Sequence, residues 1–203
     1  MLIKKIFFTI VVLTFSTVNA GIKIEHWLTA DGAKVYFVEN HDLPMLDISI
    51  SFKAGSARDT LKDNGIASLT NHLMLLGSGG VDEVDLANQF TDIGAQLDSS
   101  FDQDKSSFSL RTLSEKKDKA IQLFNLVLHK PDFNGEVITR EKKRYFASIR
   151  QGETEPSSIA SKAFMKAIYA NHSYVLPESG TLETLESIDQ LQLKEFYNNY
   201  YLS

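Results

Sequence analysis

A stretch of alternating apolar and polar residues near residue 50 constrains the fold more than any other feature of this sequence. The apolar members are Leu46, Ile48, Ile50 and Phe52, and the residues between them are Asp47, Ser49 and Ser51. A period of two is typical of a β-strand with one buried and one exposed face. The sequence therefore predicts a sheet that is covered by helices on one side only.

The other expected elements exclude a regular βαβ alternation. Further strands are expected at 25–28, 33–39, 95–101 and 106–112. Helices are expected at 64–75, 81–93, 114–131, 136–151, 156–170 and 188–200. We expect Asp63 or Asn64 to cap the first helix and Ser114 the third, because their side-chain oxygens can accept from free N–H groups. In the helix at 156–170, Phe164 and Ile168 lie on one side with Ala163 and Ala167. This grouping favours an α+β fold with a mainly antiparallel sheet.

Residues 1–20 have the pattern of a cleavable signal peptide. Lys4 and Lys5 precede an apolar run at 6–15, and Ala20 is a small residue that a signal peptidase accepts. The run is too short for a membrane span, which needs about 20 residues. We therefore expect an exported protein, periplasmic or secreted, that is cleaved near Ala20.

Composition narrows the possible partners and ligands. The net charge is −5, and removing a leader that holds two lysines and no acid makes it more negative. An acidic chain argues against nucleic acid or an anionic membrane as partner, and no apolar run after residue 20 predicts stable membrane insertion. The chain has no cysteine. Only His, Asp and Glu therefore remain as strong zinc ligands.

The helix expected near residue 70 carries a family resemblance. Residues 64–78 read NGIASLTNHLMLLGS, with a Gly-Ile-Ala lead and a Gly-Ser end. This segment resembles the motif helix of the pitrilysin-type zinc peptidases, which include insulinase and the mitochondrial processing peptidase. Their motif is His-x-x-Glu-His. Residues at i, i+3 and i+4 share a helix face, so two imidazoles hold zinc and the Glu acts as base toward a zinc-bound water.

Laid on that motif, this sequence retains one residue of three. Ser68 stands in place of the first His and Asn71 in place of the Glu, whereas His72 matches the second His. Serine and asparagine are weak zinc ligands. Asn71 also has no basic group that takes a proton from water near neutral pH.

The remaining zinc ligand of the family comes from a later helix, which the segment 140–150 resembles. Its ligand position falls on Ser148, and an upstream acidic position, two helical turns earlier, falls on Glu141. The resemblance therefore implies a degenerate site with no catalytic residue and no bound zinc cofactor. His72 and Glu141 are the possible residual ligands.

Shorter matches extend the resemblance over nearly all of 21–203. They lie at 27–38, 43–45, 52–59, 93–97, 107–110, 172–174 and 196–201. Their order implies one half of a pitrilysin-type peptidase, the N-terminal domain, with helices packed on one face of its sheet. We expect residues 21–203 to form this domain without its last strand and without the second half.

The resemblance implies a function without catalysis. Family members pair two halves or two subunits around a chamber for unfolded peptides. We expect this chain to partner an active zinc peptidase subunit and to bind peptide along an edge strand at 95–101 by β-augmentation. Two alternatives stay open: a weak or unusual zinc metallopeptidase that uses His72 and Glu141, and a stand-alone peptide-binding protein.

Simpler interpretations exist for the same residues. His72, on an otherwise apolar helix, is expected to be a hydrogen-bonded, partly buried histidine. Glu141, which precedes Lys142, Lys143 and Arg144, is expected to lie on a solvated helix face. The aromatic residues at 196–201 are expected in the core rather than in a ligand site.

Overall fold

The structure of this chain, a computed structural model, describes residues 23–202. The leader predicted at 1–20 lies outside the described residues. The described residues divide into two compact units, one ending at residue 43 and one beginning at residue 44, and each is described by itself. In the described part, no helix has both the length and the apolar character that crossing a membrane requires.

The first unit contains a β-hairpin. Strand β1 (Ile24–Leu28) pairs with the antiparallel strand β2 (Lys34–Val38). The turn between them is closed by Thr29, whose backbone N–H donates to the carbonyl oxygen of Ala33 at 2.9 Å. Gly32 adopts a φ of 84° in this turn, a conformation that glycine takes at little cost. The turn and both flanking strands agree with the sequence prediction.

The second unit is built on a three-stranded antiparallel sheet. Its strands are β3 (Met45–Phe52), β4 (Gln96–Phe101) and β5 (Ser106–Leu113), in the order β3-β5-β4. Ile48 of β3 and Leu97 of β4 both face Leu110 of the central strand. Leu110 is buried. The opposite face is polar, and there the side chains of Arg111 and Asp47 pair at 2.6 Å. The alternating pattern near residue 50 therefore predicted the buried face correctly.

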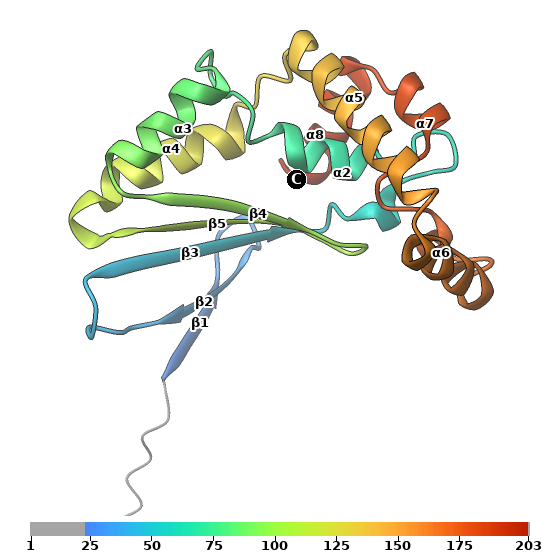
Figure 1. Cartoon of the computed structure of the whole chain (residues 1–203). Helices are drawn as coiled ribbons and strands as arrows, with labels where there is room; N and C mark the ends of the chain where they lie inside the picture. Colours follow the sequence, from blue (N-terminus) through green and yellow to red (C-terminus); the bar gives the residue numbers. More distant parts are fainter. Residues whose placement is uncertain (1–22, 203) are drawn as a thin grey trace, which may run out of the picture. The chain divides into compact units, whose positions relative to one another are not determined.

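Helices cover one face of this sheet (Figure 1). The described helices are η1 (Ser56–Arg58), α2 (Ile66–Leu73), α3 (Glu83–Asp92), η2 (Ser114–Lys116), α4 (Lys117–His129), α5 (Gly135–Gly152), α6 (Pro156–Ile168), η3 (Ser173–Val175), α7 (Leu182–Ser187) and α8 (Gln190–Tyr200). The predicted α+β fold, with an antiparallel sheet and helices on one face, is confirmed.

The core lies between the sheet and these helices. Phe108 of β5 and Leu69 of α2 are fully buried. The aromatic residues at the end of α8 join this core, as predicted. Phe196, Tyr197 and Tyr201 are each at most 6% exposed. The hydroxyl of Tyr197 donates to the carbonyl oxygen of Leu128 at 2.7 Å, which satisfies a polar group that would be costly to bury alone.

The predicted cap of the first helix is wrong. Helix α2 begins after Gly65, which has a φ of 96° and provides no side-chain cap. Instead, the carboxylate of Asp59 accepts from the backbone N–H groups of Gly65, at 2.7 Å, and of Ala67, at 3.2 Å. Asp63 accepts from Thr60. A loop residue several positions upstream therefore satisfies the free N–H groups that an adjacent cap usually takes.

Two other boundaries differ from the prediction. Ser114 starts the short turn η2, and α4 begins only at Lys117 without a side-chain cap. The region before 188 contains a helix that was not predicted, α7, which Thr181 caps. At six residues, α7 is too short to show a helical period in the sequence.

Candidate functional site

Helices α2 and α5 bring the two possible residual zinc ligands together. The Nε2 atom of His72 lies 2.9 Å from Oε2 of Glu141. The His72 side chain is 40% exposed, whereas that of Glu141 is 1% exposed. The expectation that His72 is hydrogen-bonded and partly buried is therefore confirmed. The expectation that Glu141 lies on a solvated helix face is wrong, because α5 turns this residue toward α2.

Two arginines of α5 also bind Glu141. Nε of Arg140 donates to Oε1 at 2.7 Å, and Nη1 of Arg144 lies 3.0 Å and 3.2 Å from the two carboxylate oxygens. Burial opposes the charged form of Glu141, but the hydrogen bonds from His72 and Arg140 outweigh it and hold its pKa below the ordinary value. Glu141 is thus a carboxylate with both oxygens already occupied.

Arg140 links this cluster to a third helix. Its Nη1 and Nη2 atoms donate to the two carboxylate oxygens of Glu83 in α3, at 2.9 Å and 2.5 Å. Two-point pairing of this kind fixes the plane of the guanidinium group. Helices α2, α3 and α5 are therefore connected through a single chain of charged side chains, from His72 through Glu141 and Arg140 to Glu83.

Ser68, at the first His position, hydrogen-bonds to a tyrosine. Its Oγ lies 3.2 Å from the hydroxyl of Tyr145, which also donates to the Ser68 carbonyl oxygen at 3.3 Å. The ring of Tyr145 lies beside that of His72, with 5.9 Å between centroids. Burial raises the pKa of the Tyr145 hydroxyl. This neutral phenol fills part of the space beside His72.

Asn71, at the position of the catalytic Glu, is buried against the sheet. Its Nδ2 donates to Oγ of Ser106 in β5 at 2.6 Å, and its Oδ1 accepts from Oγ of Ser99 in β4 at 3.2 Å. Both ends of the amide are therefore paired, and Asn71 fastens α2 to the two strands. A carboxylate here would accept from both serines but have no group to donate.

Ser148 stands apart from this cluster. It lies on α5 two turns beyond Glu141, and its side chain is exposed. Within residues 23–202 its hydroxyl makes no hydrogen bond to His72, Ser68 or Asn71. The structure thus brings Ser68, Asn71, His72 and Glu141 onto one region of α2 and α5, and leaves Ser148 outside their hydrogen-bond network.

Sequence reasoning missed the partners of these residues. The missed residues are Glu83, Ser99, Ser106, Arg140, Arg144 and Tyr145. Arg144 had one available signal, since residues three apart on a helix are neighbours and it follows Glu141 by three. The contacts to Ser99, Ser106 and Glu83 depend on the tertiary packing of other elements, which no local pattern shows.

The side chains present do not fit a catalytic zinc ion. Such a site typically uses three protein ligands, and residues 23–202 contain no cluster of three or more His, Asp or Glu placed to hold a metal. The His–carboxylate pair at the motif, His72 and Glu141, is directly hydrogen-bonded, and two guanidinium groups occupy the carboxylate. Zinc binding at this pair would have to displace both arginines.

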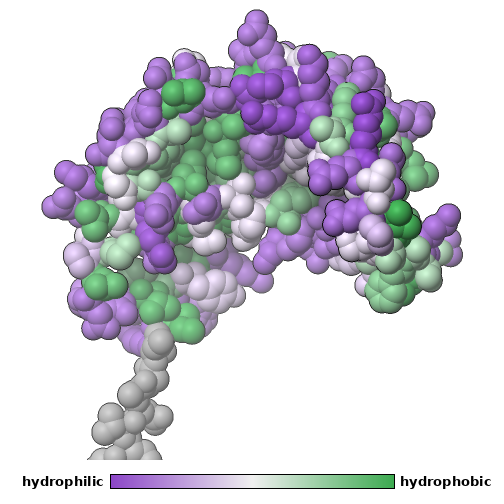
Figure 2. Space-filling model, viewed as in Figure 1, coloured by the Kyte–Doolittle hydropathy of each residue, from purple (hydrophilic) through white to green (hydrophobic). Residues whose placement is uncertain are grey.

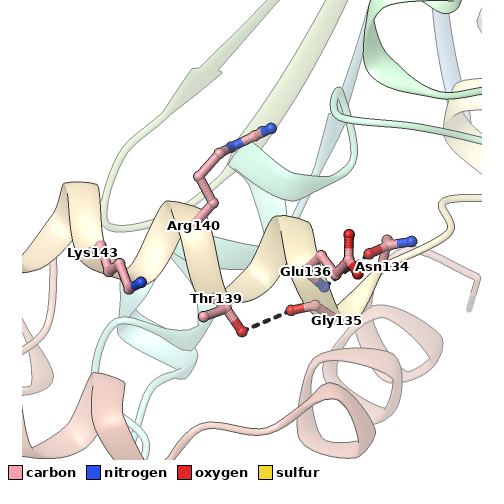
Figure 3. A pocket seen from close by; sticks show the side chains of 6 residues that line it. All are labelled: Asn134, Gly135, Glu136, Thr139, Arg140 and Lys143. Atoms are coloured by element: carbon pink, nitrogen blue, oxygen red, sulfur yellow. Dashed lines mark hydrogen bonds between the residues drawn. The ribbon is translucent and has the colours of Figure 1, made fainter.

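Two cavities lie elsewhere on the second unit. One, of about 640 Å³, surrounds the start of α5 and is lined by Asn134, Gly135, Glu136, Thr139, Arg140 and Lys143. Figure 3 shows that Arg140 extends away from the other side chains there, consistent with its pairing to Glu83 and Glu141. The second cavity, of about 550 Å³, lies between α5, α6 and residues 174–182. None of the zinc-motif positions lines either cavity.

The strand expected to bind peptide lies at a sheet edge. Among the described strands, β4 pairs only with β5. One side of its backbone is thus without a strand partner, which is the arrangement that strand addition requires. The position predicted for an edge strand, 95–101, is therefore correct, and peptide binding there stays a prediction.

Comparison with known proteins identifies similar chains. The family model described as insulinase (peptidase family M16) matches residues 34–181. An uncharacterized zinc protease of Bacillus subtilis is 24% identical over 178 residues, covering 88% of this chain and 44% of the relative. A non-peptidase homologue from Helicobacter pylori is 23% identical over 192 residues, covering 95% and 44%.

A solved structure is similar as well. The crystal structure of a peptidase M16 inactive domain from Pseudomonas fluorescens matches with a TM-score of 0.84 and 35% identity, over 87% of this chain and 43% of that one. The chain therefore spans less than half the length of each of these three proteins.

Proposed function

Because this chain belongs to the insulinase family (peptidase family M16), we propose that it is a non-catalytic member, which binds peptides and partners an active zinc-bearing subunit. The observation that carries the proposal is the set of hydrogen bonds and ion pairs that Glu141 makes. This buried carboxylate is bound by His72, Arg140 and Arg144 and so serves as the centre of an ion-pair cluster. The inactive domain of Pseudomonas fluorescens and the non-peptidase homologue of Helicobacter pylori support it by similarity.

The site has no general base at the motif position that would activate water for peptide hydrolysis. A general base must accept a proton from water near neutral pH, and the amide of Asn71 does not. Asn71 is moreover 5% exposed and bonded at both ends, so it is held against the sheet. A weak metallopeptidase that uses His72 and Glu141 is less well supported, because it has two ligands and no base.

Peptide binding is assigned to the free edge of β4. An extended peptide that pairs with β4 continues the sheet and satisfies the outward N–H and C=O groups of the strand. This mode uses backbone groups and needs no zinc. The leader pattern at 1–20 supports a location outside the cytoplasm, and we assign residues 21–203 to the N-terminal domain. A catalytic partner must then be exported too.

The metal content of the purified protein tests the non-catalytic assignment. We expect no stoichiometric zinc by inductively coupled plasma mass spectrometry and no cleavage of an unfolded polypeptide by the chain alone. The matched variants are His72→Ala and His129→Ala, the second replacing a histidine at the end of α4. One zinc per chain that is lost only in His72→Ala would contradict the proposal and support the metallopeptidase alternative.

Co-purification from the native host tests the partner. A tagged chain should recover a family member that has an intact His-x-x-Glu-His motif and its own export signal. Recovery as a monomer under conditions that preserve other complexes would favour the stand-alone alternative. Binding of peptide to β4 is tested separately, by the slowing of hydrogen exchange at the amides of Gln96–Phe101 when an unfolded peptide is added.

A further inference from the structure

The cavity beside α6 has the size and lining of a binding pocket. Its volume is about 550 Å³, within the usual range for small-ligand sites of about 300–1,000 Å³. Its apolar lining comes from three segments of the chain, and consists of Ile149, Met165, Val175, Leu176, Pro177 and Leu182. None of these residues takes part in the ion-pair cluster of Glu141, so the pocket is a feature separate from the degenerate site.

One wall of this pocket is cationic. Lys162 and Lys166 both line it from α6, one helical turn apart, where like charges repel. Within residues 23–202 neither ammonium group has an ion-pair partner. An anionic group bound between them would relieve this repulsion. The wall therefore has the charge that a carboxylate requires.

Two acids also line the pocket, and they differ in environment. Glu153 lies at the exposed end of α5, whereas Glu178 is partly buried in the loop after η3. Burial, followed by the nearby charge of Asp102, raises the pKa of the Glu178 carboxyl. The charged form of Glu178 is therefore less favourable than that of an exposed glutamate, which lowers its repulsion of a bound carboxylate.

Tyr174, which also lines the pocket, belongs to a cluster of aromatic rings. Tyr174 packs against His172 and Tyr169, with ring centroids 4.4 Å and 5.4 Å apart. Its hydroxyl donates to Oδ1 of Asp104 at 2.5 Å. These contacts fix the segment that carries Val175 to Pro177. The apolar lining at residues 175–177 is therefore formed before any ligand arrives. A preformed lining lowers the entropy cost of binding.

We propose that this pocket binds the C-terminal residue of a peptide. The apolar side chain of that residue lies against the apolar lining of the pocket, and its carboxylate lies between Lys162 and Lys166. The combination of an apolar cavity and two unpaired ammonium groups matches a group that is apolar and anionic at once. Gln103 also lines the pocket and follows the end of β4 at Phe101 by two residues. A peptide paired with β4 can therefore end in the pocket, and this extension rests on the proposed function.

Matched peptides provide the test. A short peptide labelled with fluorescein at its N-terminus is prepared in three forms: ending in leucine with a free carboxylate, ending in leucine amide, and ending in alanine with a free carboxylate. We expect fluorescence anisotropy to show the amide and the alanine forms binding at least about tenfold more weakly than the leucine acid, since each loses one of the two groups recognised.

Variants assign the binding to this pocket. Lys162→Gln combined with Lys166→Gln should reduce the affinity for the leucine acid to that of the amide, whereas Lys194→Gln, an exposed lysine of α8, should not. Ser161→Trp, which places an indole on the pocket lining, should weaken all three peptides. Circular dichroism should show each variant folded, because the replaced residues are exposed; a misfolded variant would be replaced by Lys162→Gln or Lys166→Gln alone.

The outcomes separate this inference from the proposed function. Three results would each contradict binding of a peptide C-terminus in the pocket. They are equal affinities for the leucine acid and the leucine amide, an unchanged affinity in the double-lysine variant, and no binding of the leucine acid. If a peptide still slows hydrogen exchange in β4 in those cases, edge-strand binding stands without it. Conversely, lysine-dependent binding of the leucine acid without protection of β4 keeps the pocket and removes β4 as the peptide site.

Discussion

At the scale of single residues, hydrogen bonds order the polar side chains that stand at the zinc-motif positions of α2. Ser68 and Asn71 each form hydrogen bonds to buried or half-buried partners, and Glu141 is bound on both oxygens. Buried polar groups are costly when unpaired. Ser68 and Asn71 pair with tyrosine and serine and His72 pairs with Glu141, whereas Ser148 lies exposed outside these contacts.

The first residue-scale prediction concerns Glu141. Glu141→Gln removes the charge that faces His72, Arg140 and Arg144. We expect it to destabilise the fold by about 1–3 kcal/mol, because hydrogen bonds to a charged group are lost while the arginines stay partly solvated. Urea unfolding measures this, with Glu195→Gln on the exposed surface of α8 as control. Equal stability of Glu141→Gln and the unmodified chain would contradict a central role for this carboxylate.

The second residue-scale prediction concerns Asp59, which makes the stability of the fold depend on pH. Burial raises its pKa from 3.8 to about 7, so between these values the folded state holds a proton that the unfolded state releases. Its contribution to stability is fully present below pH 3.8 and is lost as the pH rises through about 7. Asp59→Asn cannot titrate. We expect its melting temperature to fall less than that of the unmodified chain between about pH 4 and 8, as measured by calorimetry; parallel curves would refute this.

The pairing of His72 with Glu141 marks the limit of sequence-based prediction at this scale. The family resemblance placed both residues near the zinc-motif positions, because helical spacing and the order of the motifs are kept where individual residues differ. It did not predict that Arg140 and Arg144 occupy the carboxylate. Arg140 directly precedes Glu141 and Arg144 follows it by three residues, but which of these side chains turns inward depends on how α5 packs against α2 and α3. That packing is a tertiary property.

At the scale of elements, α6 is unlike the other long helices. It has no buried residue, and three of its large apolar side chains point to solvent. Ile159, Phe164 and Ile168 are 51%, 63% and 55% exposed. Figure 2 shows the resulting hydrophobic surface at the place of α6 in Figure 1. Contiguous exposed apolar surface is typical of interaction sites. Its residues Met165, Lys162 and Ser161 face the pocket instead.

A pair of substitutions distinguishes α6 from a core helix. Phe164→Ser with Ile168→Ser should change the free energy of unfolding by less than about 1 kcal/mol, since both side chains are already exposed. Phe124→Ala in α4, where the ring is 3% exposed, should cost about 3–5 kcal/mol. Chemical denaturation measures both. A large loss in the α6 variant would show that its apolar side is covered in the native protein.

The elements themselves were predicted unevenly, for physical reasons. Strand β3 and helix α4 follow from clear periods of two and 3.6 in their apolar residues. Helix α7 was missed because six residues are too few for a period, and the cap of α2 was wrong because Asp59 reaches it from a loop. The apolar side of α6 was visible in the sequence. Its exposure was not, since periodicity identifies a face without showing what lies against it.

At the scale of the whole molecule, the two units differ in how many of their side chains are buried. Every residue of β1 is exposed, and only Val35 of β2 is partly covered. The second unit contains the buried core residues of the described chain. An isolated two-stranded hairpin is marginally stable in water. The buried apolar core of the described chain therefore lies in residues 44–202.

Hydrogen exchange provides the prediction at this scale. The backbone amides of β1 and β2 should exchange much faster than those of β5, which is paired on both sides and buries Phe108 and Leu110. Mass spectrometry of deuterium uptake compares these segments directly in one sample. Protection of the hairpin equal to that of β5 would show that it belongs to the same cooperative unit.

The order of strands in the sheet has a further consequence, for the time at which the protein folds. Strand β3 pairs with β5, and the hydroxyls of Ser51 and Ser107 that meet across them are 56 residues apart in the chain. The centre of the sheet therefore cannot close until β5 has been synthesised, and pairing over such separations is intrinsically slow. Until β5 is made, the backbone of β3 lacks the strand that it pairs with in the fold, and an unpaired strand is open to association with other chains.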